Sequence, residues 1–264
     1  MPVSIKSAKE IELMRTAGRI LGRVHEELAR EIVPGMSTLD IDRICEELIR
    51  SYGCIPSFLN YEGFPASVCV SVNDEVVHGI PSGRRIVKEG DIISLDTGVI
   101  YKGYQSDAAR TVGVGNISKQ AADLIERTKL CFFAGMQYAK AGGRLFDISA
   151  AIGDCAHQYG YGVVRDLVGH GIGRNMHEPP EIPNFRQRFR GIRLRPGMTL
   201  AVEPMINIGT WRVNWSSNGW TVTTADGSLS AHYENTILIT RSGPELLSVT
   251  EEEAENLNQM YLAV

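Results

Sequence analysis

The chain has 264 residues, of which 43% are hydrophobic and 22% charged, and its formal net charge at pH 7 is −4. This composition is typical of a globular protein, and the slight negative charge gives no general basis for binding nucleic acid. The five cysteines include no Cys-x-x-Cys pair, which argues against a disulfide framework or a cysteine zinc site. Without a membrane-length apolar run or a signal peptide pattern, we expect a cytoplasmic protein with no membrane contact.

The predicted elements follow the same order twice, two helices and then strands. Ser7 and Glu10 form a capping-box pattern at the start of a helix that runs to about residue 28. A second helix is expected over residues 38–51, ended by Gly53. Strands are expected over 66–73, 91–101 and 109–115, then helices over 119–141 and 146–159, then strands over 162–169, 198–207, 220–226 and 234–241.

The two series also match residue by residue at a constant separation of 107 positions (142 minus 35, for example). The pairs are Gly35 with Gly142, Asp40 with Asp147, Gly53 with Gly160, Gly90 with Gly197, and Asp96 with Glu203. The shared separation favours a duplicated fold with pseudo-twofold symmetry over a chance recurrence of caps and turns. The second series needs an insertion before Glu234, and we predict it at 209–228, as a hairpin or loop with an Asn-Gly turn.

Four carboxylates form two symmetry-related pairs in this scheme, Asp96 with Glu203 and Asp107 with Glu234. Asp96 and Glu203 each follow an apolar strand, where a buried carboxylate is costly unless it is paired or binds a cation. Converging carboxylates cannot all ionise without compensation, which two divalent cations would supply. The alternative for any one acid is an exposed strand end or a buried ion pair, and the duplicated placement favours the metal site.

The segment 166–180, DLVGHGIGRNMHEPP, contributes His170 and His177. Its histidine spacing does not fit a zinc-binding helix, and its glycines and prolines indicate a loop or strand edge. We interpret His170 as a nitrogen ligand. One imidazole among oxygen ligands suits Mn, Fe, Co or Zn.

Several segments resemble, in the right order, the motifs of type I methionine aminopeptidases in their short bacterial form. They are HGIP, DTGVIYKGYQSDAART, GHGIGRNMHEPP, MTLAVEPMI and WTVTTADGSLSAHYENTILIT, and the resemblance runs from about Ile5 to Leu247. It implies an α+β pita-bread fold, as in creatinase and the aminopeptidases, with a curved antiparallel sheet covered by helices. Residues 1–264 would form one catalytic domain, with halves at about 1–117 and 118–250.

The resemblance also implies the residues of the site. Two divalent ions (Co, Mn, Fe, Zn or Ni) would be bound by Asp96, Asp107, His170, Glu203 and Glu234, with Asp107 and Glu234 bridging both. Glu203 would be the general base, and His78 and His177 would bind the scissile peptide. The methionine pocket would be lined by Phe58, Tyr61, Phe64, Cys69, Met176 and Trp220. A monovalent cation, Na or K, would lie at Asn73 and the Glu75 and Ser230 carbonyls.

Phe58 and Phe64 depart from that family, where a smaller residue and a tyrosine are usual, so a narrower or drier pocket is expected. The implied reaction is attack of a metal-activated water on the first peptide bond. It would release the initiator methionine from nascent polypeptides whose second residue is small. A monomer is expected.

The arginine-rich segment 186–195 is either a solvated loop or a docking patch for ribosomal RNA. Its arginines are Arg186, Arg188, Arg190, Arg193 and Arg195. Two alternatives to the function remain open: a proline-specific peptidase on this fold, such as prolidase or aminopeptidase P, and a non-catalytic binding protein that keeps the fold.

Overall fold

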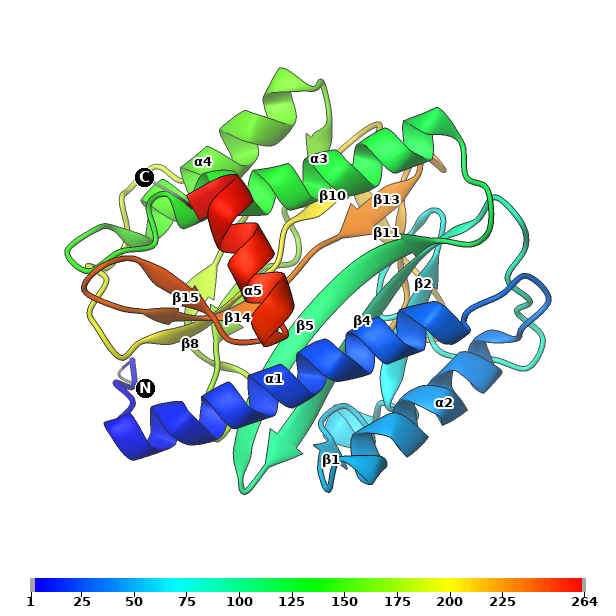
Figure 1. Ribbon diagram of the computed structural model, residues 1–264. Coiled ribbons are helices and arrows are strands. Elements are labelled where there is room, and N and C mark those ends of the chain that lie inside the picture. The colour runs from blue at the N-terminus through cyan, green and yellow to red at the C-terminus, as the bar shows by residue number, and fades with distance from the viewer. Residues whose placement is uncertain (1–2, 263–264) are drawn as a thin grey trace.

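Residues 3–262 are described by a computed structural model, in which helices cover one side of antiparallel strands (Figure 1). The helices are α1 (Ala8–Glu31), α2 (Thr38–Ser51), α3 (Lys119–Met136), α4 (Leu145–Gln158) and α5 (Glu251–Leu257), with the short turns η1 (Tyr61–Gly63) and η2 (Asn258–Leu262). No helix within residues 3–262 is both long and apolar enough to cross a bilayer.

The starts of α1 and α2 follow from side-chain caps, as predicted for α1. Ser7 and Glu10 form a reciprocal capping box, and Ser37 and Asp40 form another at α2. Helix α3 ends at Met136 and not near residue 141, so the prediction was too long there. The Ala141 N–H donates to the Thr240 carbonyl instead of continuing the helix, because the chain turns towards α4 at Gly142.

The duplication is visible in the backbone. Helices α2 and α4 each have 14 residues and occupy corresponding positions in the two halves. The glycine pairs share left-handed backbone, with φ of 98° and 87° at Gly35 and Gly142, and 90° and 89° at Gly90 and Gly197. Even the isolated bridge from Ser37 to Ile86 has its counterpart, from Arg144 to Arg193. The two halves therefore repeat one fold.

The strands divide into four antiparallel sheets across the described residues. The first half contains β1 (Ile55–Pro56), β2 (Val68–Val72) and the long hairpin of β4 (Ile92–Tyr101) and β5 (Tyr104–Gly113). The second half contains β7 (Gly169–Gly171), β8 (Glu178–Ile182), β9 (Thr199–Val202), β14 (Asn235–Ile239) and β15 (Pro244–Leu246), in the order β15-β14-β9-β7-β8. The other sheets are β13 (Ser230–His232) with β10 (Met205–Asn207) and β6 (Gly162–Val163), and β11 (Val213–Trp215) with β12 (Val222–Thr224) and β3 (Glu75–Val77).

Some predicted strands differ from the observed ones. The strand expected over 198–207 is split into β9 and β10 at Glu203-Pro204, since proline cannot donate to a strand ladder. The strand expected over 162–169 is reduced to two residues of β6, and β7 starts only at Gly169. Strand β5 begins at Tyr104, earlier than expected, and so includes Asp107.

The predicted insertion is a hairpin, formed by β11 and β12 with Gly219 in left-handed backbone at its tip. Strand β12 also pairs with β3 of the first half. The hairpin therefore brings Trp220 beside the first-half segment that carries His78, where the two rings stand edge to face at 6.2 Å.

The halves are also joined where β5 meets β14. The Asp107 N–H donates to the Thr236 hydroxyl oxygen, and that hydroxyl donates back to the Asp107 carbonyl, both at 2.9 Å. Separate apolar cores lie under each pair of helices, around Leu21, Ile41 and Leu95 in the first half and around Leu124, Phe132 and Ile148 in the second. The helices thus cover one face of the strands. The other face of β4, β5, β9 and β14 is left free to carry a site.

Candidate metal centre

A cavity of about 730 Å³, including its open mouth, is lined by residues of both halves. One part of its wall carries the four carboxylates and another part is apolar, and histidines line it as well. The predicted residues that line it are Phe58, Tyr61, Phe64, Cys69, His78, Asp96, Asp107, His170, His177, Glu203, Trp220 and Glu234.

The β4–β5 hairpin places two of the carboxylates. Asp96 lies in the middle of β4, opposite Cys69 of β2 and Ala109 of β5, and Asp107 lies on β5 opposite Gly98. Both are buried, at 8% and 4% exposure. One carboxylate oxygen of each, Oδ1, has no hydrogen-bond partner within residues 3–262. These are acceptors without donors in a buried site, which a cation would satisfy.

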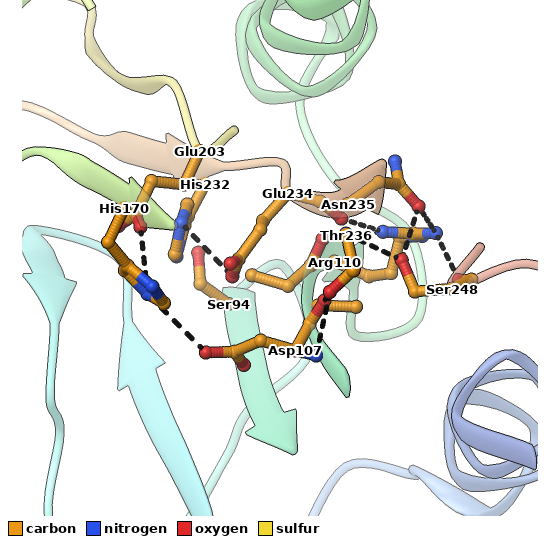
Figure 2. Close-up of polar contacts among 12 residues, drawn as sticks. Ser94, Asp107, Arg110, His170, Glu203, His232, Glu234, Asn235, Thr236 and Ser248 are labelled. Atoms are coloured by element: carbon orange, nitrogen blue, oxygen red, sulfur yellow. Dashed lines mark hydrogen bonds and ion pairs between the residues drawn. The ribbon is translucent and has the colours of Figure 1, made fainter. Parts of the chain in front are cut away.

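The second half supplies Glu203, directly after β9, and Glu234, directly before β14. The Glu234 N–H donates to the Ala109 carbonyl oxygen at 3.0 Å, and the Arg110 guanidinium donates to the Glu234 carbonyl oxygen (Figure 2). Glu234 therefore has its backbone fixed to β5 at Ala109, two residues from Asp107. The two carboxylates are brought together by backbone bonds and not by their own side chains.

His170 lies on β7 at the edge of the cluster (Figure 2). Its Nδ1 lies 2.9 Å from the Gly171 carbonyl oxygen, and its Nε2 lies 3.8 Å from Asp107 Oδ2 and 3.7 Å from Glu203 Oε1. A backbone carbonyl that accepts from one ring nitrogen leaves the other free to bind a metal. One atom each from Asp107, His170 and Glu234 lies within 4.8 Å of the others, a spacing that fits a shared cation.

The glycines beside His170 allow close packing of strands. A Cβ at Gly169 would lie 2.4 Å from the Ala201 carbonyl oxygen, and one at Gly171 would lie 2.3 Å from the Pro179 carbonyl oxygen. Any side chain at either position would collide with backbone. The glycines thus bring β7 close to its neighbouring strands, and this places His170 beside the carboxylates.

The electrostatics of the cluster also favour a cation. Burial raises the pKa of Asp96 to about 7. Burial, followed by repulsion from the neighbouring carboxylates, raises the pKa of Asp107, Glu203 and Glu234 well above their usual range. Burial lowers the pKa of His170 to about 4, so its imidazole is neutral at pH 7. The carboxylates have no neighbouring positive charge to compensate them, and a neutral imidazole lies beside them. This donor set is suited to divalent cations.

The other two predicted site histidines, His78 and His177, line the same cavity. His177 Nδ1 lies 2.8 Å from the Tyr61 hydroxyl, and its ring centre lies 4.3 Å from that of His170. His78 has left-handed backbone, with φ of 56°, and its neighbour Trp220 packs on Phe64. Burial lowers the pKa of His177, and lowers that of His78 to about 4. Both rings are therefore neutral at pH 7 and each carries one N–H.

Met176, predicted as a wall residue, lies just behind two residues that line the cavity. It is buried in a cluster against which Phe58 and Tyr61 pack, and its Cε would lie 3.1 Å from a Cβ at Gly98. The wall also includes Val77, Leu167, Val168 and Met205, which the sequence did not single out. Apolar residues on short strands look the same in a sequence whether they face a cavity or a core.

The proposed monovalent cation residues are brought together in part. The Ser230 N–H donates to the Asn73 carbonyl oxygen at 2.9 Å. The Asn73 side chain is already engaged, because its Oδ1 accepts from the Ile92 N–H and its Nδ2 donates to Asp91. Glu75 begins β3, and its carboxylate accepts from the Val72 N–H.

Two related halves that enclose a buried carboxylate and imidazole cluster define a metal-dependent hydrolase of the pita-bread type. The chain belongs to metallopeptidase family M24, whose sequence pattern matches residues 12–241. It is 54% identical to a methionine aminopeptidase of Clostridium acetobutylicum over 94% of this chain and 100% of the relative. A crystal structure of methionine aminopeptidase from Thermotoga maritima superposes with a TM-score of 0.92 at 42% identity, covering 94% of this chain and 100% of that one.

The proline-specific alternative fits less well. An Xaa-Pro dipeptidase from Bacillus anthracis gives a TM-score of 0.75 at 27% identity, and the match covers 92% of this chain but 61% of that one. The shared part is the fold, while the relatives that match along their whole length are methionine aminopeptidases.

Proposed function

We propose that this protein is a methionine aminopeptidase that removes the initiator methionine from nascent polypeptides whose second residue is small. The observation that carries the proposal is one cavity that joins a buried carboxylate cluster to an apolar pocket. The metal-binding part would hold the free, uncharged α-amine of a chain end, and the apolar part suits an unbranched thioether side chain. Together they select the end of a chain, which explains cleavage at the first peptide bond.

The ligands of two divalent cations are proposed to be Asp96, Asp107, His170, Glu203 and Glu234, with Asp107 and Glu234 shared between them. The orphaned buried oxygens and the neutral His170 ring support this set. When bound, the cations supply the positive charge that offsets these carboxylates and lowers the pKa of a water at the site. The donor set accepts Mn, Fe, Co, Zn or Ni.

The residues of the chain then perform the proton transfers and the binding. Glu203 accepts the proton of the attacking water and later returns it to the leaving amine. We assign the Tyr61 hydroxyl, 2.8 Å from His177 Nδ1, as the donor of this contact. Nε2 then carries the hydrogen and donates to the scissile carbonyl oxygen. His78, which is neutral at pH 7 and lines the same cavity, provides a second donor. Phe58, Tyr61, Phe64, Cys69 and Trp220 hold the methionine side chain.

Hydrolysis of Met-Ala-Ser by metal-stripped protein, titrated with Mn, Co and Fe, tests this function beside the Glu203→Gln variant. We expect metal-dependent release of methionine that the variant loses by 100-fold or more, roughly the contribution of a general base. Cleavage of Xaa-Pro peptides in place of Met-Ala-Ser would indicate a proline peptidase. Metal binding with no hydrolysis of either substrate would indicate a binding protein that kept the fold.

The proposal extends to partners and location. We propose that the protein acts on nascent chains in the cytoplasm and that it is a monomer. The docking patch on the ribosome would be the loop 186–195, where Phe189 is 74% exposed beside Arg188. Two of its arginines already pair with α4, Arg186 with Asp154 and Arg190 with Asp147, which reduces the free positive charge. Na or K at Asn73, Glu75 and Ser230 completes the proposed ions.

The ribosome patch is tested with Arg188→Glu and Arg193→Glu together. We expect weaker binding to ribosomes and a smaller dependence of binding on salt. Unchanged binding and an unchanged salt slope would show that the loop is only a solvated surface.

A further inference from the structure

His232 is a buried histidine that none of the roles above uses. Its ring is 1% exposed, and neither ring nitrogen has a hydrogen-bond partner in the part of the chain that the structure describes. A neutral imidazole carries one N–H, and leaving such a group buried and unpaired is destabilising. A structural core would place an apolar residue here at no such cost. The ring therefore needs a partner that the cavity side of the fold supplies.

The nearest acidic group is Glu234, whose Oε2 lies 3.9 Å from His232 Nε2 (Figure 2). The other oxygen of this carboxylate, Oε1, also lacks a partner among residues 3–262. Both side chains are 2% exposed or less, so little water competes for either. An unpaired donor and an unpaired acceptor thus face each other across a short gap.

The backbone keeps His232 in this place. Its N–H donates to the Thr111 hydroxyl oxygen, and that hydroxyl donates to the His232 carbonyl, both at 2.9 Å. On its other side β13 pairs with β10, with His232 opposite Met205. A chain held on both sides lets the ring adjust towards Glu234 but not leave it.

We propose that His232 is a positioning residue of the metal centre, whose Nε2–H donates a hydrogen bond to the Glu234 carboxylate and orients it for cation binding. This inference rests on the proposed metal-dependent function. His232 lies behind the carboxylate and not in the cluster itself, because Glu234 lines the cavity and His232 does not. Arg110 fixes the backbone of Glu234, and His232 fixes its side chain.

Hydrogen-bond partners of metal-binding carboxylates affect affinity about 10–100-fold. The test compares His232→Leu with His232→Gln, whose amide N–H can replace the imidazole donor. Binding of Mn²⁺ to each metal-stripped protein is measured by calorimetry. We expect His232→Leu to bind Mn²⁺ about 10–100-fold more weakly and His232→Gln to bind within a fewfold of the wild type. Urea unfolding of the metal-stripped proteins checks that both variants fold.

Three outcomes would overturn the proposal, each recognisably. Wild-type affinity in His232→Leu would show that the ring does not affect the site. Equal losses in both variants, with a changed visible spectrum of the Co²⁺-loaded protein, would make His232 a direct ligand. No Mn²⁺ binding by the wild-type protein would refute the metal centre itself, and this role with it.

Discussion

The hydroxyl of Tyr61 and Nδ1 of His177 lie 2.8 Å apart, although the residues are 116 positions apart in the chain. The loop that presents Tyr61 is held in unusual backbone, with φ of 66° at Asn60 and 49° at Glu62 on either side of it. Non-glycine residues adopt such angles rarely and at a cost, so their persistence here points to a functional constraint. We therefore expect Tyr61 to orient the His177 ring in addition to lining the pocket.

Tyr61→Phe keeps the ring and removes only the hydroxyl. We expect kcat for Met-Ala-Ser to fall about tenfold with little change in KM, because one hydrogen bond of roughly 1 kcal/mol no longer selects the His177 tautomer. Steady-state kinetics with the metal-loaded enzyme provide the measurement. Tyr52→Phe is the matched control, since the Tyr52 hydroxyl bonds Glu27 on α1. A rise in KM alone would reduce Tyr61 to a pocket wall.

Lys6 and Glu178 form a nearly buried ion pair at 2.7 Å, next to His177. Lys6→Met leaves the Glu178 carboxylate without its cation, and we expect the free energy of unfolding to fall by about 3 kcal/mol at pH 7. Lys119→Met, which breaks the exposed pair with Asp123, should change it by no more than about 1 kcal/mol. Urea unfolding at pH 7 compares the two variants. Equal effects would contradict a special role for the buried pair.

The same ion pair gives a pH dependence with a definite sign. Burial alone would raise the pKa of Glu178, but bonds from Lys6 and Ser4 lower it overall below its ordinary value of 4.5. The stabilisation from the pair is therefore complete above pH 4.5 and is lost as pH falls through the lowered pKa. The difference between wild type and Lys6→Met should shrink in acid. A constant difference down to pH 3 would assign the effect to packing of the lysine stem.

Gly169→Ala should disturb the site by displacing β7, the strand that carries His170. Its Cβ would lie 2.4 Å from the Ala201 carbonyl oxygen, so β7 and β9 must separate. We expect destabilisation by roughly 1–3 kcal/mol, as for other overpacked sites, and weaker metal binding because His170 moves with β7. Thermal unfolding and Mn²⁺ calorimetry measure both effects. Gly83→Ala is the control, since a Cβ there would meet only Leu39 Cδ2, at 3.8 Å. Similar results for the two variants would refute the packing argument.

The buried His25 on α1 should make the free energy of unfolding depend on pH in the acid range. Burial, and to a lesser extent the Arg110 charge, lowers the pKa of His25 from 6.5 to about 3, while its Nε2 lies 2.9 Å from the Ala108 carbonyl oxygen. The unfolded chain then binds one more proton than the folded protein between these two pH values. The contribution of neutral His25 to the free energy of unfolding is thus complete above pH 6.5. It falls with decreasing pH by up to about 1.4 kcal/mol per pH unit.

His25→Gln should make the free energy of unfolding less dependent on pH across this window. Denaturant unfolding of metal-stripped protein at several pH values compares the two slopes, and the absence of metal removes the effect of metal loss in acid. Parallel slopes would show that His25 is protonated in the folded protein.

Much of the site was predictable because it is encoded in local patterns that occur twice. A glycine, an apolar strand and a carboxylate recur in both halves, which identified Asp96 and Glu203 as equivalent before any fold was known. The capping box at Ser7 and the hairpin at 209–228 likewise depend on residues that are neighbours in the sequence. Such features depend on backbone geometry over a few residues, and short-range interactions are enough to specify them.

Other features depend on which side chains meet across the fold, and only the tertiary structure decided those. Met176 packs in a cluster with Phe58 and Tyr61 against it, and His232 lies beside Glu234 because β13 is fixed between Thr111 and β10. Lys6 meets Glu178 across 172 positions of sequence. An alternating strand pattern tells which residues share a face but not which neighbour that face meets. Strand twist, the bulge after His170 and the packing of distant segments determine that neighbour.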